Sequence, residues 1–178
     1  MENPVEEIGH VIRSLTQTPP HIQRYTINRY FTPNASFTHP FCRTGSFENS
    51  RWVIGMIYRW YKIMSPHIDL DVTSVAYDEK MLRLYVEVHQ IFSIWLVPFY
   101  AANVSLVTVI DLAYDKPRQV YLIKSQNDLY QTTEFIKFFW PGGWVVAMLW
   151  QYVATLLSIL GALILWPVTL VEDKFNLG

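Results

Sequence analysis

Apolar residues recur at helical spacing in three stretches of the first 64 residues. Pro4 opens the first stretch and Pro19-Pro20 closes it, so helices are predicted over residues 4–16 and 20–30. A third helix is predicted over residues 51–64. We expect its buried face to consist of Trp52, Val53, Met56, Ile57, Trp60 and Ile63 or Met64.

From residue 67 onward the period of the apolar positions changes to two. Strands are predicted over residues 68–73, 82–89, 104–114 and 119–129, and the second of them extends toward Phe92 and Trp95. A short extended segment at residues 35–41 lies between the helices. This order of elements predicts an α+β fold, with a curved antiparallel sheet and the N-terminal helices on one side of it.

Residues 144–166 carry no formal charge, and Gln151 is their only strongly polar side chain. A helix of this length would be about 34 Å long, enough to cross a hydrocarbon core of roughly 30 Å. We therefore predict one domain over residues 1–139 and a membrane anchor over residues 140–178, with the helix at about 144–166. The anchoring tryptophans are expected to be Trp140, Trp144, Trp150 and Trp166.

Other arrangements of this segment stay open. It would also suit a core helix docked onto its own domain or onto a second copy, or a hairpin in a lipid monolayer that bends at Gly161. Ala154, Ser158 and Ala162 form a stripe of small residues that would let two such helices approach closely. A homodimer through this stripe is therefore a further expectation.

Charge and cysteine content narrow the classes of partner. The formal net charge is -1 and no run of Lys and Arg occurs, so nucleic acid is not expected as a partner. Cys42 is the only cysteine, which excludes an intrachain disulfide and fits a reducing compartment. The first residues lack the pattern of a secretory signal. We expect a tail-anchored protein of an intracellular membrane, the endoplasmic reticulum or a lipid droplet, with its domain facing the cytosol.

Several strings of residues resemble a known family. Residues 30–41 (YFTPNASFTHPF) and 125–130 (SQNDLY) resemble motifs of the nuclear transport factor two-like, or SnoaL-like, superfamily. Residues 2–8 (ENPVEEI), 58–66 (YRWYKIMSP) and 138–144 (FFWPGGW) are similar to fungal SigF-like members of it. The resemblance implies a cone-shaped domain. That fold hosts isomerases, dehydratases, cyclases, epoxide hydrolases and non-catalytic binders, so it leaves the function open.

The resemblance also implies where chemistry would occur. Enzymes of this fold usually work with an Asp/His or Asp/Tyr set in an apolar pocket, where burial raises the pKa of the carboxyl. The catalytic candidates are His39, His89, Asp111 and Asp128. The candidates for the pocket wall are Tyr58, Tyr61, Phe92, Trp95 and Gln126.

Each candidate also has a structural interpretation. His89 and Asp111 lie on strands expected to be neighbours, where they would form a proton-transfer pair, a structural hydrogen-bonded pair or part of the outer face. His39 would contact a ligand or fix the bend before Pro40. Asp128 and Gln126 would line the mouth of the cone or face solvent.

No metal or cofactor is expected, because the sequence has no HxH or HExxH motif and no glycine-rich phosphate loop. Two classes of function therefore remain. One is a membrane-attached domain that binds a small hydrophobic molecule, such as a lipid, sterol or polyketide/terpenoid, with or without isomerisation, dehydration or cyclisation. The other is an adaptor or subunit of a membrane complex. An open apolar cavity of about 300 Å³ or more with convergent His and Asp groups would favour the first.

Overall fold

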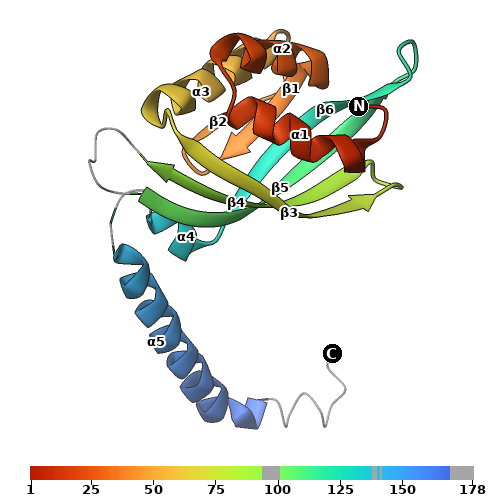
Figure 1. Ribbon diagram of the computed structural model, residues 1–178. Helices are drawn as coiled ribbons and strands as arrows, with labels where there is room; N and C mark the ends of the chain where they lie inside the picture. Colours follow the sequence, from red (N-terminus) through yellow and green to blue (C-terminus); the bar gives the residue numbers. More distant parts are fainter. Residues whose placement is uncertain (94–100, 138–139, 141, 169–178) are drawn as a thin grey trace.

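The computed structural model describes residues 1–93, 101–137, 140 and 142–168, apart from the side chain of Phe92. Its helices are α1 (Pro4–Thr16), α2 (Pro20–Tyr30), α3 (Ser50–Met64), α4 (Thr132–Ile136) and α5 (Gly143–Ile164). Its strands are β1 (Phe31–His39), β2 (Cys42–Thr44), β3 (Ile68–Asp78), β4 (Arg83–Ser93), β5 (Ala101–Asp115) and β6 (Val120–Tyr130). Figure 1 shows α1, α2 and α3 on one face of a strongly curved sheet.

The sheet is mixed, which corrects the prediction of an antiparallel sheet. Its six strands lie in the order β2-β1-β6-β5-β4-β3. Strands β3 to β6 form the predicted antiparallel meander, whereas β1 pairs with β6 in parallel, with Phe37 opposite Gln126. Parallel neighbours need a long connection, and α3 with the rest of the meander supplies it. The periodicity of residues 35–41 gave no information about the direction of pairing.

The buried face of α3 also differs from the prediction. Ile54 and Tyr58 are buried, whereas Trp52 and Trp60 expose 69% and 57% of their surfaces. The helix carries two apolar stripes, and the one that packs against Phe37 of β1 is the stripe that contains Tyr58. Met56 and Ile63 share the exposed side with the two tryptophans.

The hydrophobic core lies between the helices and the concave face of the sheet. Ile8, Val11 and Leu15 of α1 are buried in one cluster with Val86 of β4 and Ile110 of β5. These strand residues sit at alternate positions, so each strand turns its apolar side toward the helices. The concave face of the sheet is therefore the inner wall of the fold.

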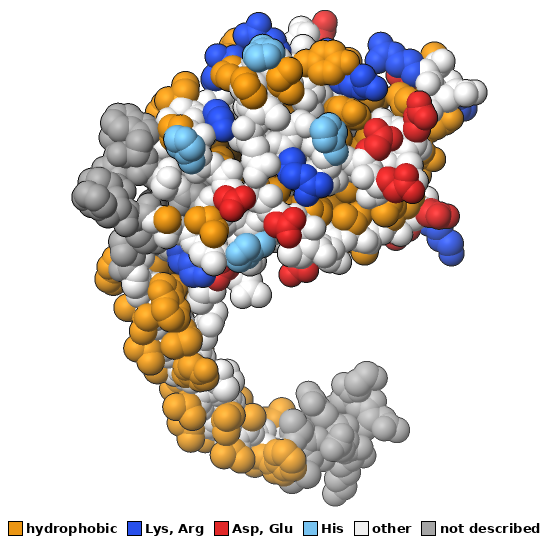
Figure 2. Space-filling model, viewed as in Figure 1, with side chains coloured by type: hydrophobic (Ala, Val, Ile, Leu, Met, Phe, Trp, Pro, Cys, Tyr) orange, Lys and Arg blue, Asp and Glu red, His pale blue; other side chains and the backbone are white. Residues whose placement is uncertain are grey.

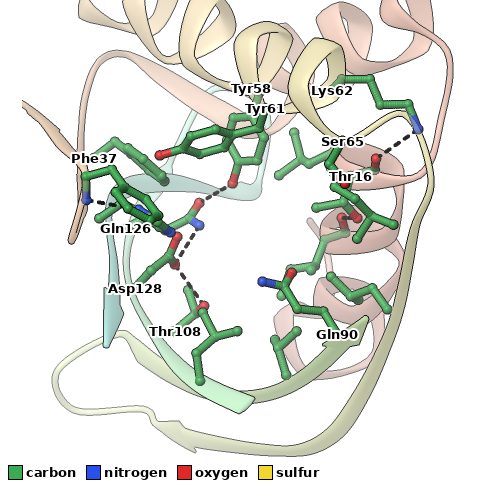
Figure 3. A pocket seen from close by; sticks show the side chains of 18 of the residues that line it. Thr16, Phe37, Tyr58, Tyr61, Lys62, Ser65, Gln90, Thr108, Gln126 and Asp128 are labelled. Carbon is green, nitrogen blue, oxygen red and sulfur yellow. Dashed lines mark hydrogen bonds between the residues drawn. The ribbon is translucent and has the colours of Figure 1, made fainter. Parts of the chain in front are cut away.

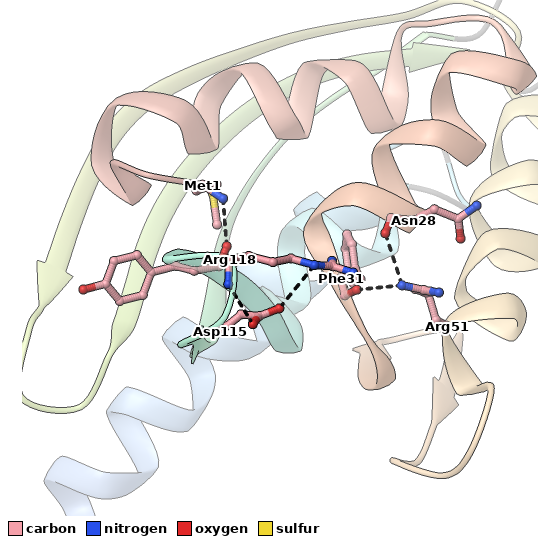
Figure 4. Close-up of polar contacts among 7 residues, drawn as sticks. Met1, Asn28, Phe31, Arg51, Asp115 and Arg118 are labelled. Carbon is pink, nitrogen blue, oxygen red and sulfur yellow. Dashed lines mark hydrogen bonds and ion pairs between the residues drawn. The ribbon is translucent and has the colours of Figure 1, made fainter.

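Two backbone-directed contacts hold the N-terminal layer in place (Figure 4). The Arg51 guanidinium donates hydrogen bonds of 3.1 Å to the carbonyl oxygens of Asn28 and Phe31, where α2 ends and β1 begins. The backbone of Met1 pairs with that of Tyr121, and the side chain of Met1 is buried. The layer of helices is thus tied to both β1 and β6.

Helix α5 leaves the domain instead of packing into it (Figure 1). Its 22 residues are long and apolar enough to cross a membrane, judged by length and composition. Its large side chains are exposed, Leu156 by 62% and Trp150 by 66%. On the face shown in Figure 2, hydrophobic side chains cover α5 while charged side chains gather on the domain.

Two of the alternative arrangements for this segment are therefore not found. The helix is not docked into its own domain, and it continues through Gly161 without a hairpin bend. Ala154, Ser158 and Ala162 lie along the helix, with the Ser158 hydroxyl donating to the carbonyl of Ala154. A homodimer through these residues remains a prediction.

Candidate functional site

A cavity of about 370 Å³ opens between α1, α3 and the concave face of the sheet. Apolar side chains from each of these layers line it, among them Leu15, Phe37, Val88 and Leu106. Figure 3 shows the polar side chains that project from its walls. Its volume exceeds the roughly 300 Å³ expected of an open binding cavity.

Asp128 of β6 lines this cavity. Its Oδ1 atom accepts hydrogen bonds from the Thr108 hydroxyl (2.9 Å) and from the Gln126 side-chain amide (3.0 Å). Burial raises the pKa of the Asp128 carboxyl to about 6, although both hydrogen bonds act in the opposite direction. Among the described residues none donates to Oδ2, so this oxygen is the one available to a ligand in the cavity.

Tyr58 of α3 fixes the side chain of Gln126, which in turn contacts Asp128. Its hydroxyl donates a hydrogen bond of 3.0 Å to Oε1 of Gln126, which orients the amide so that Nε2 points at Asp128 (Figure 3). Burial raises the pKa of Tyr58, and the nearby Asp128 charge raises it further, so the phenol stays protonated at neutral pH. The result is a series of two hydrogen bonds that runs from Tyr58 of α3 through Gln126 of β6 to the Asp128 carboxylate.

His39 is buried at the end of β1 and also lines the cavity. Its Nδ1 atom accepts a hydrogen bond of 3.3 Å from the backbone N–H of Phe41, and its Nε2 lies 3.4 Å from the Tyr130 hydroxyl. Desolvation lowers the pKa of His39 to about 4, so the ring is neutral at pH 7. The ring therefore fixes the bend before Pro40 and also faces the cavity, while its contact with a ligand stays a prediction.

Tyr61 and Gln90 complete the polar lining of the cavity. The Tyr61 hydroxyl lies 3.1 Å from Sγ of Cys42, and burial raises the pKa of Tyr61. Gln90 donates a hydrogen bond of 3.0 Å to the Tyr130 hydroxyl. Its amide points into the cavity from the wall opposite Asp128 (Figure 3).

Sequence reasoning missed Thr108, Gln90 and Tyr130. The sequence did contain an indication of them, because each continues an alternation of inward-facing residues along its strand. Gln90 comes two positions after Val88, and Thr108 comes two positions after Leu106. A polar residue that interrupts the apolar side of a strand is worth noting as a candidate for a cavity wall.

His89 and Asp111 lie outside the cavity. His89 contacts the Ser105 hydroxyl (3.1 Å) on the outer face, and Asp111 accepts a hydrogen bond of 2.6 Å from Arg83. Across the β4–β5 pair, Ser105 is opposite His89 and Arg83 is opposite Asp111, so the residue opposite His89 lies six positions from Asp111 on β5. A His89–Asp111 pair, catalytic or structural, is therefore wrong, and the alternative that the structure has is a place on the outer face.

Two candidates for the pocket wall, Phe92 and Trp95, have side chains outside the described part of the structure. Trp95 falls outside the described residues, and only the backbone of Phe92 is described, opposite Ile68. Within the described part of the chain, no group of three His, Cys, Asp or Glu residues is placed to hold a metal ion. The described side chains that line the cavity include the Asp128 carboxylate, the neutral His39 imidazole and several hydrogen-bond donors. Such groups can bind a ligand and transfer a proton.

Solved structures with the same fold include several enzymes. The epoxide hydrolase/cyclase-like enzyme SalBIII, described for pyran ring formation in the polyether salinomycin, is 13% identical, with a TM-score of 0.57 over 75% of this chain and 97% of its own. An epoxide hydrolase of M. tuberculosis is 10% identical, with a TM-score of 0.53 over 76% and 90%. A SnoaL-like isomerase candidate from Agrobacterium tumefaciens is 8% identical, with a TM-score of 0.52 over 71% and 97%.

At these identities the likeness shows the fold alone, an NTF2-like fold. No curated protein matches the chain significantly in sequence. The sequence profile of one family, the SigF NTF2-like domain, matches residues 1–167. This match extends past the predicted domain boundary at residue 139 and includes α5. Because the profile covers nearly the whole sequence, the chain belongs to the SigF NTF2-like domain family.

Proposed function

We propose that this protein is a membrane-anchored domain that binds a small hydrophobic molecule and moves a proton on it without a cofactor. The observation that carries the proposal is Asp128, a carboxyl with a pKa of about 6 in the wall of an apolar cavity. Both of its protonation states are populated near neutral pH, so it can accept a proton at one position of a ligand and return it at another. Isomerisation, dehydration and cyclisation are reactions of this class.

The geometry gives the neighbouring residues distinct tasks. Thr108 and Gln126 hold Oδ1, which leaves Oδ2 for the proton. The amide of Gln90 faces the cavity and can donate a hydrogen bond to an oxygen of the ligand that gains negative charge, and Tyr61 lines the same cavity. His39 is neutral at pH 7, so it serves as a hydrogen-bonding wall and not as a cation.

The chemistry of the wall defines the class of ligand. A cavity of about 370 Å³ suits a compact lipid, sterol fragment, polyketide or terpenoid with one or two polar groups. The competing function, a non-catalytic adaptor, would have been favoured by a cone filled with its own Trp and Phe side chains. The cavity is open, which supports a ligand.

A generic substrate for buried carboxylates tests the proposal. In the elimination of 5-nitrobenzisoxazole, a base removes the C3 proton, the N–O bond breaks, and a coloured cyanonitrophenolate forms. The full chain in mild detergent is expected to catalyse this reaction with a rate that rises to a plateau above about pH 6. Asp128→Asn should lower the rate by about 100-fold or more, the usual contribution of a positioned base.

His89→Ala and Asp111→Asn are the matched controls, because both residues carry proton-transfer groups outside the cavity. They should leave the elimination unchanged. An elimination rate that is equal in the parent chain and in Asp128→Asn would overturn the proton-transfer part of the proposal. If the chain only retains the compound, as measured by equilibrium dialysis, the cavity is a carrier site.

Membrane attachment through α5 has its own test. The full chain should float with vesicles in a density gradient, and a chain truncated before Trp140 should stay in the soluble fraction. A truncated chain that still sediments with carbonate-washed membranes would remove the anchor from the proposal.

A further inference from the structure

The mouth of the cavity is apolar and exposed. Phe41 and Trp60 line the cavity and still expose 41% and 57% of their surfaces, so they mark its opening. Ile63, three residues after Trp60 on α3, is 53% exposed. We refer to Phe41, Trp60 and Ile63 as the rim. Two exposed aromatic side chains at the opening, with the exposed Ile63 one helical turn from Trp60, are costly in water, and they suit contact with another apolar phase.

The rim is connected to the start of α5. The Phe41 ring contacts the Phe135 ring of α4, with centroids 5.1 Å apart. Helix α4 in turn packs on the first turn of α5, where Gly143 approaches Ile136 so closely that an added Cβ would lie 2.6 Å from Cγ2. Because α4 has only five residues, a rise of about 7 Å, the mouth lies close to the end of the apolar helix.

The side chains around this junction match a membrane interface. Trp140 and Trp144 are exposed where α5 begins, as expected of aromatic residues at the level of the lipid headgroups. Lys62 lies on α3, as Trp60 and Ile63 do, and it lines the cavity. Its Nζ atom is 3.4 Å from the carbonyl oxygen of Thr16. Among the described residues no carboxylate pairs with Lys62, so its charge is available to an anionic headgroup.

We propose that the rim dips into the surface of the bilayer that α5 enters, and that the cavity takes its ligand directly from the lipid. The inference rests on the proposed function, because it requires α5 to be in a membrane. A molecule that enters this way leads with its polar group, which meets Asp128 and Gln126 inside, while its hydrocarbon part stays at the rim. The ligand class is therefore an amphiphile that resides in membranes, and its tail can exceed the length of the cavity.

A single fluorescent label tests the position of the rim in the full chain. Cys42 is the only cysteine, so a Cys42→Ser background carries one introduced thiol, at Ile63→Cys or at Met81→Cys. Met81 is similarly exposed (62%), and it lies at the β3–β4 turn, outside the cavity and at the other end of β4 from Gln90, which lines the cavity. Each variant is labelled with an environment-sensitive dye and reconstituted in vesicles of phosphatidylcholine and phosphatidylserine.

We expect blue-shifted emission and quenching by nitroxide lipids for the label at residue 63, and neither for the label at residue 81. Flotation of the same samples separates the two levels of the proposal. If the protein does not float, the anchor and the rim inference both fall. If it floats while the label at residue 63 is as exposed to water as the label at residue 81, the rim inference alone is overturned.

Loading from the bilayer has a kinetic readout as well. A derivative of 5-nitrobenzisoxazole with a long alkyl chain is delivered in vesicles, and the parent compound is delivered in water. In Ile63→Glu the ratio of the vesicle-delivered rate to the water-delivered rate should fall about tenfold, because a charge at the rim opposes contact with lipid. A ratio equal to that of the unsubstituted chain contradicts bilayer loading, and the parent compound by itself still reports on the proposed chemistry.

Discussion

The Thr108 hydroxyl donates a hydrogen bond of 2.9 Å to Oδ1 of Asp128, which lies directly opposite it on the neighbouring strand. This contact, with the one from Gln126, fixes Oδ1 of a carboxylate that lines the cavity. Burial raises the pKa of Asp128 while these two donors lower it, and burial dominates. The balance produces a carboxyl that changes its protonation near neutral pH.

Asp128→Asn should stabilise the protein above neutral pH. The pKa of Asp128 is about 6 when folded and 3.8 in the unfolded reference, so its proton stabilises the folded state below about pH 4, and this contribution is lost as the pH rises through 6. A shift of this size corresponds to about 3 kcal/mol, and Asn keeps an Oδ1 acceptor for Thr108. Chemical unfolding at pH 4 and pH 7.5 measures the difference between variant and parent, which should grow by most of that amount, because the carboxyl of the unfolded chain is already partly deprotonated at pH 4. A difference independent of pH would contradict the buried titration.

His39→Gln should show the opposite dependence on pH. Desolvation lowers the pKa of His39 from 6.5 to about 4, so its neutral ring stabilises the folded state above pH 6.5, and this contribution is lost as the pH falls through 4. The variant should therefore gain about 3 kcal/mol relative to the parent between pH 7 and pH 4. The parent should itself vary little in this window from these two groups, because their effects oppose each other. Unfolding curves of both single variants on one pH series test this.

Tyr58→Phe should destabilise the protein by about 1–3 kcal/mol, because it leaves the buried Oε1 of Gln126 without its donor. The matched control is Tyr61→Phe, the same chemical change about one turn along α3. The Tyr61 hydroxyl contacts the sulfur of Cys42, a weak partner, so its loss should cost less than about 1 kcal/mol. Equal losses in the two variants would mean that the Tyr58–Gln126 contact has no special weight.

The two faces of α3 should respond very differently to truncation. Ile54→Ala removes a fully buried side chain and should cost about 2–5 kcal/mol in unfolding free energy. Trp52→Ala removes a larger but mostly exposed side chain and should change stability by about 0.5 kcal/mol or less. Thermal unfolding of both variants in detergent measures these changes in stability. A large loss of stability in Trp52→Ala would mean that the face predicted from the periodicity is the buried one.

Several features of this protein follow from its sequence alone, because they depend on contacts within one segment. Proline positions and apolar spacing predicted α1 and α2 with the bounds that the structure has. Alternation predicted the meander, and an uncharged stretch predicted the long apolar helix. The short elements β2 and α4 were missed, since three and five residues carry too little periodicity. Gln90 and Thr108 could have been predicted as cavity residues, because each is a polar residue on the otherwise apolar side of its strand.

Only the tertiary structure decided which of these residues meet. Helix α3 has two apolar stripes of helical spacing, and its packing on Phe37 selects the one that contains Ile54 and Tyr58. His89 lies on the polar side of its own strand, and the β4–β5 register places it far from Asp111. The depth of Asp128, and hence its raised pKa, depends on strands and helices distant in sequence closing over it. Periodicity is a local property, whereas burial and register arise from contacts between segments far apart in the chain, and for this reason the sequence predicts the elements and the fold creates the site.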